Sequence, residues 1–105
     1  MMNFTAIEME ALLKSIQYWI DKWDFECPTL FALEKSDLVE LVKTWPASFS
    51  TDEERTLIAS LGSLRELLHG ASAVSKEKVP ELIGIEYEEA SALCGRIHSE
   101  CQSAL

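Results

Sequence analysis

Apolar side chains recur every three or four residues in four separate stretches of this chain. Each stretch is flanked by residues that favour the ends of helices. Such spacing places the apolar groups on one face of an α-helix. No stretch alternates apolar and polar residues as a half-buried strand does. The sequence therefore predicts an all-α fold, a compact bundle of about four antiparallel helices joined by short connections.

The first stretch has the clearest boundaries. Thr5 and Glu8 have the spacing of a capping box, which predicts that a helix begins there. Pro28 disfavours helical geometry at Cys27, so this helix should end before that point. Its apolar face consists of Met9, Leu12, Leu13, Ile16, Trp19, Ile20 and Trp23.

The second and third stretches also carry end signals. Ser36 can cap the second helix and Pro46 terminates it, with an apolar face of Leu38, Leu41, Val42 and Trp45. Two overlapping capping boxes open the third helix, Ser50 with Glu53 and Thr51 with Glu54. Gly70 is placed to end it in the left-handed conformation. Its apolar face consists of Leu57, Leu61, Leu64 and Leu68.

The fourth stretch is apolar on two sides. Pro80 fits the first position of a helix, although Gly84 could delay the start. One side is a heptad-like seam of Ile83, Tyr87, Ala90, Cys94, Ile97 and Cys101, and the other carries Leu82, Ile85 and Leu93. Such a helix is either central in its bundle or uses one side to contact a partner. Across all four helices, we expect burial of Leu13, Ile16, Trp19, Leu41, Leu61, Leu64, Tyr87, Cys94 and Ile97.

Length and charge restrict the class of protein. The 105 residues fit a single helical domain, 1–105, with a net charge of −9. A strongly acidic surface repels phosphate groups, so binding to nucleic acid or to an anionic membrane is disfavoured. The first residues lack the regions of a signal peptide, and no apolar run is long enough for a membrane span. We therefore expect a cytoplasmic protein.

The chemistry-bearing residues do not form a recognisable active site. Cys94, His98 and Cys101 share one helix face and are zinc ligand types, with Cys27 as a conceivable fourth ligand. However, Cys94 and Cys101 lie on the apolar seam, where free cysteine packs as a small apolar residue. The three cysteines are therefore expected to be reduced. We expect no metal, no cofactor and no enzymatic activity.

Two segments combine carboxylates with apolar groups and are candidates for binding a partner. Aromatic side chains follow the first helix beside acidic ones, at Asp24, Phe25, Glu26 and Phe31. The start of the fourth helix offers Glu81, Ile85, Glu86, Glu88 and Glu89. Aromatic residues are favoured as binding anchors, and carboxylates attract basic partners. In both segments the apolar groups could instead pack inside the bundle.

In its small size, its acidic charge and its lack of catalytic motifs, the chain resembles the immunity proteins of bacterial toxin systems as a class. That resemblance implies a binding protein that neutralises a cognate toxin, for example a nuclease with a basic cleft. The alternative is a homo-oligomeric structural or regulatory helical module, a homodimer for instance, that associates through the second face of the fourth helix.

Overall fold

A computed structural model describes residues 4–22, 33–70 and 73–104. These residues form six α-helices and one 3-10 turn, and no strand occurs among them. The helices are α1 (Ala6–Asp21), α3 (Lys35–Lys43), α4 (Ser48–Thr51), α5 (Glu53–His69), α6 (Val79–Ile83) and α7 (Tyr87–Ala104), and the 3-10 turn is η1 (Lys76–Lys78). The prediction of a compact all-α fold is confirmed. The four longest helices correspond to the four apolar stretches, α4 is a short addition, and α6 is the separated start of the fourth stretch.

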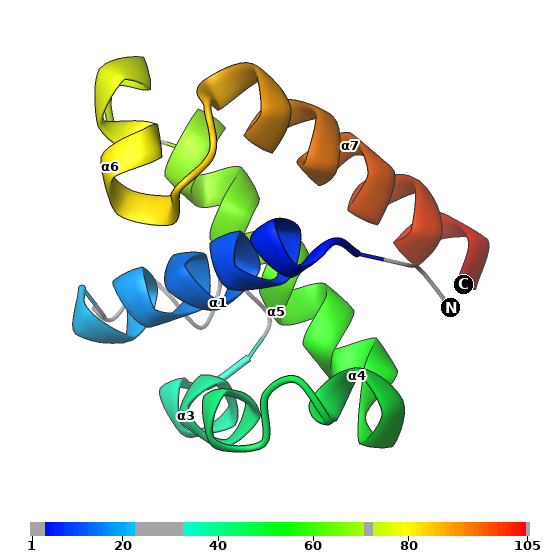
Figure 1. The fold of residues 1–105 in the computed structure, drawn as a ribbon. Helices are drawn as coiled ribbons and strands as arrows, with labels where there is room; N and C mark the ends of the chain where they lie inside the picture. The colour runs from blue at the N-terminus through cyan, green and yellow to red at the C-terminus, as the bar shows by residue number, and fades with distance from the viewer. Residues whose placement is uncertain (1–3, 23–32, 71–72, 105) are drawn as a thin grey trace.

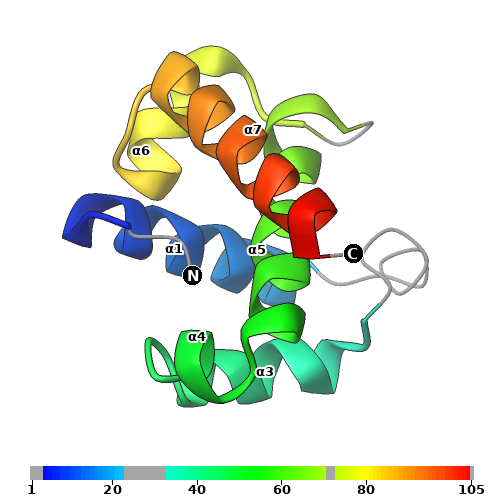
Figure 2. The same cartoon turned by 90° about the vertical axis from the view of Figure 1, so that its right-hand side faces the viewer.

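Helix α5 lies at the centre of the arrangement. It packs against α1, α4 and α7, while α1 also contacts α3 and α6. Figures 1 and 2 show that α1 crosses α5 at a steep angle, whereas α7 runs antiparallel to α5 along one side. The crossing of α1 and α5 therefore holds the two halves of the molecule together.

The core has two parts, one on each side of that crossing. The larger part joins α1, α5, α6 and α7, and its fully buried side chains include Leu12, Leu64, Leu67, Ile83, Leu93 and Ile97. The smaller part joins α1, α3 and α5 through Ile16, Trp19, Leu38, Leu41 and Ala59. Of the nine residues expected to be buried, only Leu13, Leu61 and Tyr87 are half-buried instead.

Small residues allow α1 to approach the backbone of α5. Ala59 packs with Ile16 and Trp19, and the Trp19 Nε1 donates a hydrogen bond to the Ser63 carbonyl. The hydroxyls of Ser60 and Ser63 are buried without a hydrogen-bond partner among the described residues. This crossing is therefore closely packed but not fully hydrogen-bonded.

The capping box at the first helix is confirmed. Thr5 Oγ1 accepts a hydrogen bond from the Glu8 amide at 3.1 Å, and the Thr5 amide donates to Glu8 Oε1 at 2.9 Å. The cap predicted at Ser36 is wrong, because Glu34 is the N-cap and the helix begins at Lys35, two residues earlier than a cap at Ser36 implies. Asp37 Oδ2 accepts from the Glu34 amide at 2.9 Å and so fixes the earlier start.

Two predictions for the third helix are also wrong. Ser50 and Thr51 belong to α4, and Thr51 Oγ1 donates to the Ala47 carbonyl instead of capping α5, whose N-cap is Asp52. Gly70 ends α5 but has an extended backbone with φ −76°. A Cβ there would lie 2.9 Å from the Glu66 carbonyl oxygen, so close approach explains this glycine.

The left-handed glycine is Gly84, with φ 83°. It ends α6, and α7 begins three residues later, so the fourth predicted helix is broken in two. The chain changes direction at this point (Figure 1).

Candidate interaction surface

The junction between α6 and α7 gathers the carboxylates predicted to bind a partner. Glu81 lies on α6, Glu86 precedes α7, and Glu88 and Glu89 lie in its first turn. All four are exposed, and none takes part in an ion pair with another described residue. Glu88 and Glu89 also interact favourably with the positive, N-terminal end of the α7 dipole, so they stabilise this helix as well.

The apolar residue predicted to anchor a partner at this junction is not available. Ile85 is only 6% exposed and belongs to the larger core. The prediction that it forms an exposed anchor is therefore wrong. Leu93 is also buried and Leu82 is half-buried, so most of the second apolar face of the fourth helix packs internally. Self-association through that face would require the core to open.

The other predicted segment cannot be compared with the structure. Asp24, Phe25, Glu26 and Phe31 lie outside the described residues, so their role in binding stays a prediction.

A small aromatic and basic cluster flanks the junction. Tyr87 Oη and His69 Nδ1 are 3.2 Å apart, and the Lys76 ammonium lies 4.9 Å from the centre of the Tyr87 ring. These contacts join the end of α5, η1 and the start of α7. Sequence reasoning missed the cluster because its members are brought together only by the packing of three elements.

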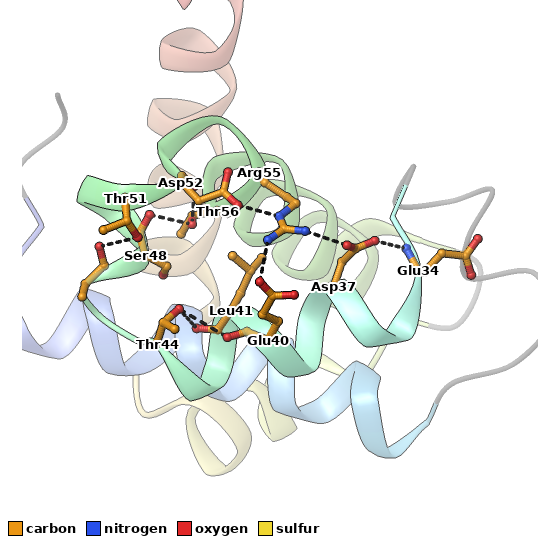
Figure 3. Close-up of polar contacts among 11 residues, drawn as sticks. Glu34, Asp37, Glu40, Leu41, Thr44, Ser48, Thr51, Asp52, Arg55 and Thr56 are labelled. Carbon is orange, nitrogen blue, oxygen red and sulfur yellow. Dashed lines mark hydrogen bonds and ion pairs between the residues drawn. The ribbon is translucent and has the colours of Figure 1, made fainter.

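A second charged cluster is centred on Arg55, which extends from α5 towards α3 (Figure 3). Its guanidinium contacts three carboxylates: Asp37 at 2.7 Å, Asp52 at 2.7 Å and Glu40 at 3.3 Å. Asp37 uses its other oxygen to accept from the Glu34 amide. One arginine thus joins the start of α3 to the start of α5.

The electrostatics of this cluster favour a structural role. Desolvation alone would lower the pKa of Arg55, but the charges of Asp52, Glu40 and Asp37 together raise its pKa above the ordinary value. Thr56 reinforces the corner, because its hydroxyl donates to the carbonyls of Asp52 and Ser48. Arg55 is held on three sides, so its carboxylates are less available to a partner than those at the α6–α7 junction.

The described residues bring together few groups that could bind a metal or take part in catalysis. In the described part of the chain, no set of three His, Cys, Asp or Glu residues is placed to hold a metal ion. The side chain of Cys101 is not described, so the full Cys94, His98 and Cys101 set stays untested. Burial raises the pKa of the Cys94 thiol, and the charge of Arg65 opposes this only in part. Cys94 is therefore unsuited to act as a thiolate.

No described helix combines the length and apolar character needed to cross a membrane. On the surface that the described residues form, open hollows lie beside α3, between α1 and α3, and between α1 and α6. None of these hollows contains a histidine or a cysteine.

No protein-family model matches this chain, and no curated protein or solved structure matches it significantly.

Proposed function

We propose that this protein binds and neutralises a basic protein partner, in the manner of an immunity protein that blocks a cognate bacterial toxin. The observation that carries the proposal is the set of exposed carboxylates at the α6–α7 junction, Glu81, Glu86, Glu88 and Glu89, which have no ion-pair partner among the described residues. The net charge of −9 supports it, because it steers a basic partner towards the surface.

A rigid base positions these carboxylates. Val79, Ile83 and Ile85 are buried on both sides of the left-handed turn at Gly84, so the junction is fixed to the core. Preorganised charges bind with a smaller entropy loss than charges on a mobile loop. The junction has no exposed apolar anchor among its described residues, so the lifetime of the complex depends on groups elsewhere on the protein. Phe25 and Phe31 remain the candidates for this role.

The test compares two charge reversals of equal size. Glu86→Lys with Glu89→Lys changes the net charge by four units at the junction, and Glu10→Lys with Asp21→Lys changes it equally on α1, where both residues are exposed. Each chain serves as bait in the native host, and the co-purifying basic protein is identified and its binding kinetics measured. Circular dichroism checks that helix content is kept.

We expect the junction variant to slow association about tenfold at low salt, and to weaken its salt dependence, while the α1 variant changes it little. Co-expression should show the same ranking in protection of cells from the partner. Equal effects of the two variants would mean that net charge alone attracts the partner, and would reject the junction as the binding site. Failure to recover any basic partner would reject the function.

A further inference from the structure

A line of four residues follows the outer side of α5, where three of them are exposed and the fourth, Leu61, also packs against the larger core. Glu54, Ile58, Leu61 and Arg65 follow at intervals of four, three and four residues, which places them along one side of the helix. Glu54 and Arg65 are exposed, and Leu61 is half-buried. Ile58 is 36% exposed, whereas most large apolar side chains of α5 are buried. This α5 stripe is charged at both ends and apolar in the middle.

The two charges of the stripe are free to meet a partner. Neither Glu54 nor Arg65 forms an ion pair with another described residue, in contrast to Arg55 and Arg96, which are held by carboxylates. The charges have opposite signs and are separated by about 16 Å along the helix axis at 1.5 Å per residue. They are therefore too far apart to neutralise each other.

The stripe is complementary to itself when its direction is reversed. In an antiparallel copy, Glu54 lies opposite Arg65 of the second copy, and Ile58 lies opposite Leu61 of the second copy. The same contacts recur in the other half, because the acidic and basic residues are equally distant from the apolar pair. A two-fold axis between Ala59 and Ser60 produces this match, as an isologous interface requires.

We propose that this surface binds a second copy of the same chain, with the two α5 helices antiparallel. Each dimer then contains two Glu54–Arg65 pairs that flank a patch formed by Ile58 and Leu61 from both copies. The buried area is small, so the association is weak and reversible. The carboxylates of the α6–α7 junction lie on other elements, and this inference does not depend on the proposed function.

Charge reversal provides the decisive experiment. Glu54→Arg alone and Arg65→Glu alone each place like charges opposite one another, and each should weaken self-association about tenfold or more. The double variant with both substitutions restores opposite charges and should dimerise like the parent chain. Mixing the two single variants should produce a heterodimer. Sedimentation equilibrium over micromolar to millimolar concentrations measures all four.

A matched pair of apolar substitutions tests the centre of the stripe. Ile58→Asp should abolish the dimer, whereas Ile7→Asp should leave it unchanged, because Ile7 is 65% exposed on α1 and lies outside the stripe. Circular dichroism confirms that both variants remain helical. A parent chain that stays monomeric over the whole concentration range would overturn the proposal. A dimer that survives Glu54→Arg, or no recovery in the double variant, would overturn it as well.

Discussion

The indole Nε1 of Trp19 donates a hydrogen bond to the backbone carbonyl of Ser63 at 2.8 Å, within the crossing of α1 and α5. Trp19→Phe removes this donor and part of a buried ring, so we expect a loss of roughly 1–3 kcal/mol in the free energy of unfolding. Urea denaturation measures it. The neighbouring Tyr18→Phe is the control, with an expected change within about 0.5 kcal/mol, because Tyr18 is only half-buried. Similar losses for both variants would mean that the hydrogen bond contributes little.

Two glycines should respond in opposite directions to the same substitution. Gly84 has φ 83°, so Gly84→Ala should cost about 1–2 kcal/mol through backbone strain alone, since nothing lies within 4 Å of the added Cβ. Gly95 lies inside α7 with equally open surroundings, and Gly95→Ala should stabilise by up to about 1 kcal/mol. Thermal unfolding distinguishes the two. A stabilising Gly84→Ala would contradict the left-handed turn.

Glu8 should make stability depend on pH on the acidic side. Burial opposes ionisation, but the hydrogen bonds from Thr5 and the guanidinium of Arg96 at 2.6 Å outweigh it, so the pKa lies below its ordinary value of 4.5. The carboxylate therefore contributes stability above pH 4.5. That contribution is lost as the pH falls through the lower, folded-state pKa.

Glu8→Gln tests this linkage. Glutamine retains an acceptor for the capping box but not the charge that attracts Arg96, so stability should become less dependent on pH below 4.5. Urea midpoints between pH 3 and 7 measure the effect, over the range where carboxylates titrate. Glu10→Gln is the control, because its pairing with Lys14 is long, 3.9 Å, and exposed. An unchanged pH profile in Glu8→Gln would reject the role of this carboxylate.

Arg55 should stabilise the junction of α3 and α5 through geometry as well as charge. Arg55→Ala leaves three neighbouring carboxylates without a cation and should lower the Tm. Arg55→Lys should recover only part of it, since an ammonium group cannot reproduce the planar fork that contacts all three. Double-mutant cycles should give stronger coupling with Asp37→Asn than with Glu40→Gln, because Asp37 is nearer and less exposed. Equal coupling would contradict this geometry.

The Cys94 thiol should react slowly in the folded protein. It is 7% exposed, and burial raises its pKa, so both access and thiolate formation are suppressed. In a chain with Cys27→Ser and Cys101→Ser, reaction with a thiol reagent should be at least about 100-fold slower when folded than in urea. Metal analysis of the unmodified chain should find no zinc. Zinc that is lost in His98→Ala would instead support the ligand set of Cys94, His98 and Cys101.

Local signals in the sequence predicted local structure well. Thr5 and Glu8 lie within one helical turn, so their spacing is sufficient to recognise the cap. The apolar spacings also gave the correct inward face of α5 and α7, since burial of that face dominates the stability of a helix. Ser36 failed as a cap because Asp37 accepts from the Glu34 amide and fixes a start two residues earlier, and a choice between nearby caps depends on contacts of about 1 kcal/mol.

The surface was harder to predict, because it depends on how helices meet. The spacing of the fourth stretch predicts that Ile85 lies on a second apolar side of the helix, which either packs internally or contacts a partner. The break at Gly84 changes the direction of the chain and places the Ile85 side chain in the core. Arg55 and Asp37 are 18 residues apart, and only the packing of α3 beside α5 brings them together. The exposure of the four glutamates at the α6–α7 junction was predicted correctly, because charged side chains avoid burial whatever the exact bounds of the helix.

The buried Ser60 hydroxyl, which has no hydrogen-bond partner among the described residues, has a consequence for engineering. It lies in the central helix, where alanine has the higher helix propensity and carries no polar group to desolvate. Substitution of buried serines by alanine on the inner face of α5 is therefore the first change to try for a more thermostable form of this protein. Such substitutions leave the acidic surface unchanged.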